Sequence, residues 1–521
     1  MRCHPVQSID HEIKVKLQPM TERAPLVARD TDVPELRAVL SKLAAVGYSE
    51  RGVSERLGLE DLAGLRWHPL PIYRAERLAR RDRLDLAIDL FLLQGALPAG
   101  QLERLFTRSE CDALVRVGLV AIDEEAGTAR ARASLFPVAK HLIFSDHAWP
   151  ELPHPGYSTV PSDHVMAIGP DSRKLARCTT RRPCRTALDL CTGSGIHALL
   201  ASRHSSQVVA VDINPRAALC TRFNAQASGV ANLEVVVGDL FDAVRGQHFD
   251  LITANPPFVP SPLDSLRFRD GGRSGEDIQK RIVAGLPDHL APGGRAQMVT
   301  ELGEREGETL VPRLREWLAG APMDIHILRL GEHTAANYAL GHAKGDDYET
   351  FLASIDDWAT NLRTQGYARI VSVVISLQWS DASAGPPWER VDLSPPPLRA
   401  AGAEIDAVFR AERRMRQPDW QQALKRSCLR RSGPVAILGA RVMGTDLQAN
   451  TKATLLGQAL KIDHQLDPVE YEILERINDR ERTPAQDLID VFRDPHREEP
   501  TVLAALRSLV QRQLVQTDGV G

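Results

Sequence analysis

The chain alternates between apolar, β-branched runs and helix-length segments over residues 185 to 300, and this pattern constrains its fold more than any other feature. The runs are Thr186–Leu190, Gln207–Val211, Leu233–Val237, Phe249–Ala254 and Arg295–Thr300, and Arg369–Leu377 reads as a later strand of the same sheet. Strands that alternate with helices are typical of βαβ units, which build a parallel sheet covered by helices. We therefore predict an α/β fold around such a sheet.

The rest of the chain predicts further domains, because 521 residues exceed one ordinary core. Residues 1–30 mix charges and prolines and are expected to form a flexible arm. Short helical patterns, a charged turn and an alternating segment favour a winged-helix-like N-terminal domain at 31–150. The sheet domain is assigned to 151–385, because glycine and proline become dense at its end. Residues 386–521 are expected to form a C-terminal α+β or helical domain with a helical module.

Composition argues against nucleic acid as a partner. The net charge is -4 and aromatic residues make up 5%, so neither a global field nor a stacking surface favours it. Winged helices often bind DNA, but no lysine- and arginine-rich recognition helix stands out in the N-terminal domain, for which a structural or lid role is favoured. The basic cluster between Arg413 and Arg431 is typical of a solvated face. We therefore expect a small-molecule or protein substrate.

The seven cysteines are scattered, with no CxxC pair and no zinc-type spacing. This pattern indicates reduced thiols and no metal site. The N-terminal residues contain no apolar segment of signal-peptide length, and no apolar run is long enough to span a membrane. We expect a cytoplasmic protein without membrane contact. The sequence does not predict the oligomeric state.

A glycine turn follows the first strand of the predicted sheet, within Leu188–Leu199. Gly193 and Gly195 would let the backbone turn sharply and approach a ligand. Glycines alone would also suit a dinucleotide. However, Asp189 ends the strand before the turn, where it would repel a pyrophosphate and could meet the ammonium group of a methionine moiety.

Acidic residues also end the next two strands. Asp212, followed by Ile213, is placed to accept the hydroxyls of a ribose, as an acidic residue about 20 positions after a glycine turn does in such folds. Asp239, followed by Leu240, would face the amino group of an adenine. These features favour S-adenosylmethionine (SAM) as the cofactor. The expected cofactor contacts are Asp189, Cys191, Thr192, Gly193, Gly195, Asp212, Ile213, Asp239, Leu240 and Asn255.

The candidate catalytic residues are Asn255, Pro256, Pro257 and Phe258, which follow the strand that ends at Ala254. An amide or guanidine nitrogen is a poor nucleophile, because its lone pair is delocalised. The side-chain oxygen of Asn255 and the carbonyl of Pro256 could accept its two N–H bonds and orient the lone pair. Phe258 could stack on the planar group and exclude water. The tetrapeptide therefore predicts reaction at a planar nitrogen.

Taken in order, these motifs resemble class I SAM-dependent methyltransferases with a Rossmann-like sheet. Among them, they are similar to the glutamine N5-methyltransferases of release factors and a ribosomal protein, and to their "small" methyltransferase relatives. The resemblance covers about residues 160–305 and implies SAM as methyl donor. Cys191 stands where a glycine is commonest, although similar Cys-Thr-Gly-Ser-Gly turns occur in the ribosomal-protein branch. The added domains look like those of larger actinobacterial-type methyltransferases.

Two further residues are candidate substrate contacts. Asp270 lies in the charged, glycine-rich loop Arg269–Asp277, which could fold over the substrate. Glu301 follows a strand at the ligand-bearing edge, as do Glu304 and Glu306 shortly after it, and a carboxylate there could pair with a cationic substrate.

Three functions remain open from the sequence. We favour N-methylation of a small amino-acid-type substrate, such as a guanidino amino acid of specialised metabolism, because flanking domains can enclose a pocket. The alternative is methylation of a protein glutamine. The tetrapeptide also occurs in enzymes that methylate nucleic-acid bases, because an exocyclic base amine poses the same chemical problem. A second alternative is a SAM-binding regulator that binds DNA, although such a sensor has no need of an amide-binding loop.

Overall fold

The computed structural model describes residues 24–65, 72–147, 161–263, 266–394, 400–438, 451–456, 463–478, 480–493 and 498–518. Most of the predicted flexible arm, up to residue 23, lies outside these described residues.

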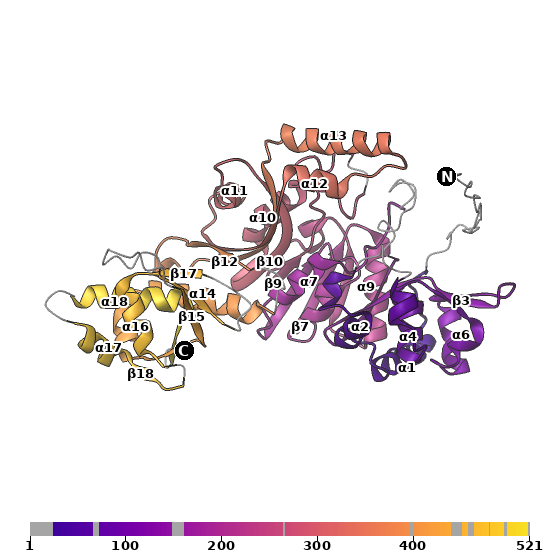
Figure 1. Ribbon diagram of the computed structural model, residues 1–521, viewed down its shortest axis with the longest axis horizontal. Helices are drawn as coiled ribbons and strands as arrows, with labels where there is room; N and C mark the ends of the chain where they lie inside the picture. The colour runs from indigo at the N-terminus through magenta and orange to yellow at the C-terminus, as the bar shows by residue number, and fades with distance from the viewer. Residues whose placement is uncertain are drawn as a thin grey trace, which may run out of the picture.

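An eight-stranded sheet forms the centre of the molecule, with strand order β13-β11-β12-β10-β9-β6-β7-β8 (Figure 1). Its strands are β6 (Cys184–Leu190), β7 (Ser205–Asp212), β8 (Leu233–Val237), β9 (Phe249–Ala254), β10 (Leu290–Glu304), β11 (Met323–Thr334), β12 (Arg369–Trp379) and β13 (Glu389–Leu393). Strands β6 to β10 pair in parallel, whereas β12 runs antiparallel to both β10 and β11. The predicted α/β fold is confirmed. The sequence patterns did not predict β11 or β13.

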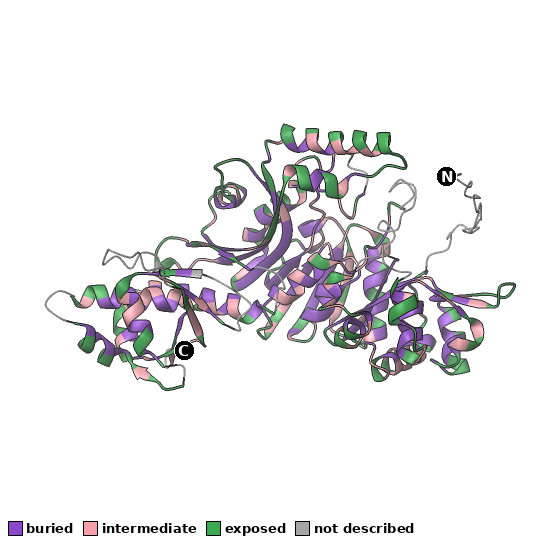
Figure 2. Ribbon diagram, in the orientation of Figure 1, coloured by how far each residue is buried: buried purple, intermediate pink, exposed green. Residues whose placement is uncertain are grey.

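The strands alternate their side chains between two apolar layers, as the two-residue period of a strand requires. Leu188, Leu190 and Val209 belong to one core cluster, with helices α10 and α11. Ala187 and Val208 face the opposite side, toward helix α8. Helices thus cover both faces, and purple buried segments run through the centre of the sheet in Figure 2. The helices of this part are α7 (Pro170–Cys178), α8 (Ile196–Ala201), α9 (Pro215–Ser228), α10 (Asp277–His289) and α11 (Leu310–Trp317).

Two helices, α12 (Ala335–His342) and α13 (Tyr348–Thr364), are inserted between β11 and β12. The last residue of β11, Thr334, pairs with Arg369 at the start of β12, and Arg369 also pairs with Glu304 at the end of β10. The insertion therefore begins and ends at the edge where the parallel strands finish. Figure 1 shows α12 and α13 together at that edge.

The N-terminal elements share a core with the sheet domain. They comprise α1 (Val33–Ala45), α2 (Glu50–Leu57), α4 (Arg83–Ala87), α5 (Ala99–Leu102) and α6 (Arg108–Arg116), with the strands β1 (Ala96–Pro98), β2 (Val120–Asp123), β3 (Thr128–Ala131), β4 (Ser134–Val138) and β5 (His141–Ser145). Phe144 of β5 packs edge-on against Phe223 of α9, with ring centroids 5.5 Å apart. The side chain of Asn224 donates to the Phe144 carbonyl and accepts from its N–H. The boundary predicted near residue 150 therefore crosses a continuous core.

Three strands of the N-terminal part form a small sheet in the order β1-β3-β2. The winged-helix interpretation of this part stays a prediction.

The C-terminal elements begin with α14 (Gly402–Arg416), which also packs on the sheet domain. Ile405 and Phe409 of α14 share a core cluster with Leu175 of α7. The guanidinium of Arg295, which is 1% exposed, donates to Asp406 at 3.2 Å. The later elements are α15 (Trp420–Arg426), α16 (Pro468–Arg476), α17 (Ala485–Phe492) and α18 (Glu499–Gln511), with the sheets β18-β14-β19 and β15-β16-β17. Their strands are β14 (Cys428–Arg431), β15 (Val435–Leu438), β16 (Thr451–Leu455), β17 (Asp463–Leu466), β18 (Thr483–Pro484) and β19 (Val515–Asp518). The domain boundary predicted at 386 also stays a prediction.

Candidate active site

The glycine turn between β6 and α8 has left-handed backbone at Cys191 (φ +54°), Gly193 (φ +57°) and Gly195 (φ +83°). A Cβ at Gly195 would lie 2.8 Å from the Cγ2 of Thr221 on α9, so this glycine permits the close approach of two elements. A Cβ at Gly193 would meet no atom within 4 Å. The backbone of Gly193 therefore borders open space, as a cradle for a ligand requires.

Asp189 stabilises this turn through hydrogen bonds. Its carboxylate accepts hydrogen bonds from the Thr192 hydroxyl at 2.6 Å, the Thr253 hydroxyl at 2.8 Å and the Ala198 N–H at 3.1 Å. The side chain is buried, and burial raises its pKa to about 7. These donors explain why an acidic residue is needed here, whereas its predicted contact with a ligand ammonium stays a prediction.

Asp212 stands at the end of β7, beside the turn. One of its oxygens accepts from the Gly193 N–H at 2.8 Å and the other from the Asn214 N–H at 2.9 Å. The next residue, Ile213, has an apolar side chain that is 50% exposed. An exposed isoleucine next to an oriented carboxylate suits a ligand with a polar sugar and an apolar ring.

Asp239 follows β8, and its carboxylate accepts from Arg281 of α10 at 2.8 Å. Leu240 after it is buried and has a positive φ of +48°. Burial raises the pKa of the Cys191 thiol well above its usual range, and the negative charges of Asp212, Asp189 and Asp239 raise it further. This local negative field favours a cationic ligand and opposes a pyrophosphate.

Asn255 leaves the end of β9 and is held by a residue that the sequence patterns did not predict. Its Nδ2 donates to the Oγ of Ser172 on α7 at 3.0 Å. Ser172 is 5% exposed, whereas Asn255 is partly exposed, so this bond is partly buried. Among the described residues, no donor is bonded to the Oδ1 of Asn255. The amide is thus anchored by its nitrogen, and its oxygen remains as an acceptor.

The loop after Phe258 folds back on the tetrapeptide. The N–H groups of Phe258 and Val259 both donate to the Arg269 carbonyl at 3.0 Å. A Cβ at Gly275, where φ is +73°, would lie 2.5 Å from the Phe258 carbonyl. The two oxygens of Asp270 accept from the Leu266 N–H and the Arg269 guanidinium. Asp270 is 6% exposed, so it shapes this loop, and the substrate contact expected for it from sequence stays a prediction.

Glu301 lies near the end of β10, and it accepts a hydrogen bond of 2.7 Å from the Tyr338 hydroxyl of α12. Burial and, to a smaller extent, the negative charge of Asp171 raise the pKa of Glu301 to about 7. Lys174 lowers it, while its ammonium bonds Asp171 at 2.8 Å and Ser372 at 2.9 Å. Glu301 and Ser372 are register partners. Of the three predicted glutamates, Glu304 is paired with Arg329 and Glu306 is exposed, which leaves Glu301 as the candidate.

Aromatic side chains of the insertion cover this edge. Tyr338 and His342 stack with ring centroids 4.2 Å apart, and Trp358 of α13 lies 6.4 Å from Tyr338. The guanidinium of Arg269 lies 5.7 Å from the centre of the Trp358 ring. Phe258 packs against the same cluster. The insertion therefore forms an aromatic wall beside the tetrapeptide.

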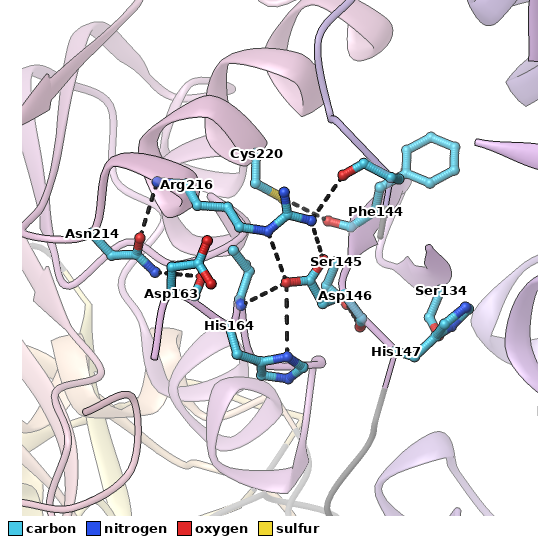
Figure 3. A network of polar contacts seen from close by, with 12 residues as sticks. Ser134, Phe144, Ser145, Asp146, His147, Asp163, His164, Asn214, Arg216 and Cys220 are labelled. Atoms are coloured by element: carbon cyan, nitrogen blue, oxygen red, sulfur yellow. Dashed lines mark hydrogen bonds and ion pairs between the residues drawn. The ribbon is translucent and has the colours of Figure 1, made fainter. Parts of the chain in front are cut away.

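An ion pair ties the N-terminal elements to the cofactor side of the site (Figure 3). The guanidinium of Arg216, at the start of α9, donates through both Nε and Nη2 to the carboxylate of Asp146, which is 1% exposed. Asp146 also accepts from the Val165 N–H at 3.0 Å. Asn214 accepts from the Arg216 N–H and donates to the Asp163 carbonyl at 2.9 Å. This network fixes the chain around Asp163 next to the acidic end of β7.

Sequence patterns could not have identified Ser172, Tyr338 or Asp146, because each is a common residue in an ordinary helix or strand context. Only their spatial partners mark them. Within the described residues, no group of three or more histidine, cysteine or acidic side chains could hold a metal ion. No helix of the described ranges is long and apolar enough to cross a membrane.

The sheet order, the antiparallel β12, the glycine turn and the acidic strand ends together define the fold of a class I methyltransferase. Residues 166–314 match the family described as methyltransferase small domain. Residues 45–133 match a family described only as a domain of unknown function (DUF7059).

Several curated methyltransferases are similar over this central part. A release factor glutamine methyltransferase of Cereibacter sphaeroides is 35% identical over 27% of this chain and 55% of its own. A ribosomal protein uL3 glutamine methyltransferase of Bradyrhizobium diazoefficiens is 37% identical over 22% of this chain and 40% of its own. A tRNA1(Val) (adenine(37)-N6)-methyltransferase of Porphyromonas gingivalis is 32% identical over 26% of this chain and 59% of its own. The chain therefore spans about half the length of these relatives.

Proposed function

We propose that this chain is a SAM-dependent N-methyltransferase that methylates the side-chain amide of a glutamine in a protein. The observation that carries the proposal is the anchoring of Asn255 by Ser172 at the end of β9. This bond uses the amide nitrogen of Asn255 and leaves its oxygen to accept an N–H from the substrate. An anchored acceptor of this kind suits a primary amide, which has two N–H bonds to be bound.

The residues around the glycine turn suit SAM. Gly193 offers open space, Asp212 can accept from ribose hydroxyls, and Ile213 can cover an adenine face. The negative field at Cys191 favours the positive charges of the cofactor. When bound, SAM supplies a methyl group on a sulfonium, which is a good leaving group.

The substrate amide would be bound by two oxygens. The Oδ1 of Asn255 and the carbonyl of Pro256 would accept its two N–H bonds and disfavour delocalisation of the nitrogen lone pair into the carbonyl. Phe258 would pack on the planar group and exclude water. As the new N–C bond forms, the bond between the sulfonium and its methyl group would break and the thioether would leave, while one of the two amide protons would pass to solvent water.

We rank a protein glutamine ahead of the small amino-acid-type substrate that the sequence alone favoured. Two of the three relatives described above are named as glutamine methyltransferases. A small guanidino compound remains the second candidate, because the buried carboxylate of Glu301 at the ligand-bearing edge could pair with a cation. A DNA-binding regulator is disfavoured, since a sensor has no need of an anchored amide acceptor.

Transfer of labelled methyl groups tests the proposal. The full-length protein would be incubated with methyl-labelled SAM and, separately, with purified release factor, ribosomal protein uL3, free guanidino amino acids and tRNA. We expect label on a glutamine nitrogen of a protein, located by mass spectrometry. Label found only on tRNA or on a guanidino compound would contradict the protein substrate, and label only on oxygen or carbon would contradict N-methylation.

A further inference from the structure

The inserted helices α12 and α13 have two different faces, and the inner face belongs to the candidate active site. Tyr338 donates to Glu301, and Trp358 packs in one cluster with Val259 and Phe258. The side chain of Asn361 donates to the Pro260 carbonyl at 3.0 Å and to the Arg273 carbonyl at 3.0 Å. The insertion is therefore held rigidly beside the tetrapeptide.

The outer face carries apolar side chains that remain exposed among the described residues. Tyr348 is 74% exposed, Leu340 is 53% exposed and Leu352 is 44% exposed. Tyr348 and Leu352 lie one turn apart on α13, and Asp356 continues the same row. In Figure 2, exposed residues run along the outward side of α13. Single exposed apolar residues are common on proteins, but a tyrosine and two leucines on one small insertion suggest a contact surface.

The same insertion is acidic. Its acidic residues are Asp346, Asp347, Glu349, Asp356 and Asp357, and its basic residues are Lys344 and Arg363. Arg363 lies 3.7 Å from Asp356, and both side chains are mostly exposed, so this pair is weak. Asp347 caps the N-terminus of α13 by accepting from the Thr350 N–H at 2.8 Å. The remaining carboxylates give the outer face a net negative charge.

We propose that the outer face of the α12–α13 insertion docks a basic segment of the protein substrate, so that the substrate glutamine reaches Asn255. The charge of the face selects a lysine- or arginine-rich partner, and the exposed tyrosine and leucines supply apolar contact at its centre. The inner face contacts Phe258, so a segment bound outside is separated from the tetrapeptide by the helices of the insertion. One helix diameter is about 10 Å, a distance that a few extended substrate residues can span. This inference rests on the proposed function and names the chemical class of the substrate.

Charge reversal on α13 tests the docking surface. The variant D356K/D357K would be compared with E124K/E125K, which makes the same change of charge on exposed residues of the β2–β3 turn. The probes are two synthetic 20-residue peptides with one central glutamine, flanked either by lysines and arginines or by serines. Binding would be measured by fluorescence anisotropy at low and moderate salt, and methylation by label transfer.

We expect the wild-type protein to bind the basic peptide more tightly than the serine peptide, and the preference to fall as salt rises. D356K/D357K should weaken binding of the basic peptide about tenfold at low salt, whereas E124K/E125K should leave it within about twofold. Leu352→Ser should weaken both peptides without changing the salt dependence. SAM affinity should be unchanged in every variant.

Equal binding of the basic peptide by wild type and D356K/D357K would overturn the docking proposal, and so would equal binding of the two peptides. Binding that follows the expected pattern without any methylation would leave the docking surface standing and contradict the proposed function. The two failures are therefore distinguishable.

Discussion

The hydrogen bond between Ser172 and Asn255 leads to a quantitative prediction. Ser172→Ala removes the acceptor that holds the Asn255 nitrogen at 3.0 Å. The Asn255 amide can then rotate and present its NH2 group to the substrate, where only an acceptor is useful. A neutral hydrogen bond of this kind contributes about 0.5–1.5 kcal/mol, which corresponds to roughly a threefold to tenfold loss. We expect kcat to fall by that factor.

The KM for SAM should not change in Ser172→Ala, because Ser172 lies on α7 and the cofactor residues Gly193 and Asp212 are bonded to each other and not to it. Asn255→Ala removes the acceptor itself. By analogy with the removal of one group that stabilises a transition state, kcat should fall about 100-fold to 1000-fold. SAM affinity, measured by calorimetry, should stay close to that of the wild type in both variants.

A double-mutant cycle decides whether Ser172 acts through Asn255. If it does, Ser172→Ala should have almost no further effect on kcat in the Asn255→Ala background, measured under single-turnover conditions with labelled SAM. A loss of the same size in both backgrounds would refute the reasoning, because the serine would then act through α7 or through protein stability. Chemical denaturation of each variant would provide the stability control.

Three further predictions concern the cofactor turn, the buried carboxyl and the ion pair. Gly195→Ala should destabilise the fold by about 1–3 kcal/mol, since its Cβ would meet Thr221 at 2.8 Å in a left-handed conformation. Gly193→Ala should reduce SAM affinity more than it reduces stability. Chemical denaturation would measure the stability of each variant, and calorimetry would measure its SAM affinity. The pKa of Glu301 is raised from its ordinary value of 4.5 to about 7 in the folded protein. Ionisation of Glu301 therefore lowers the free energy of unfolding as the pH rises from 4.5 to about 7. Glu301→Gln should therefore gain Tm relative to the wild type between pH 5 and pH 8, and a constant difference would contradict the shift. Arg216→Met removes the guanidinium that pairs with the buried carboxylate of Asp146. This change should lower the unfolding free energy by about 3–5 kcal/mol in urea denaturation, while an unchanged midpoint would contradict a buried pair.

The sequence predicted those parts of the fold that depend on local pattern. Strands such as β9 are short and mostly apolar, and the glycine turn has residues whose backbone freedom is required at that place. Strand β11 escaped prediction because its last four residues, from Gly331 to Thr334, are polar and exposed, which shortens the apolar run. The α/β fold could be predicted because its central strands bury both faces, whereas a strand with one solvated end resembles a loop.

The sequence predicted only those residues of the candidate site whose position follows directly from a local motif. The positions of Asn255 and Asp212 follow from the strands that precede them. The partner of Asn255 lies 83 residues earlier in the chain, and no periodicity relates the two. The pattern around Asp270 suggests a substrate contact, which stays a prediction, whereas the bonds of its carboxylate within the loop could not be predicted from the sequence.

The insertion between β11 and β12 explains why the tetrapeptide alone does not determine the substrate. Thr334 and Arg369 are already paired across the two antiparallel strands, so a tight turn of a few residues could join them. The chain instead uses residues 335–368 there, and they place Tyr338 on Glu301 and an acidic, partly apolar surface on the outside. The sheet does not need this segment to join its two strands, yet the segment contacts the reacting edge. Recognition of the substrate is the best explanation for it. In the proposed function, the planar-nitrogen chemistry would therefore take place at the end of β9, and substrate selection would depend on the insertion that the sheet positions.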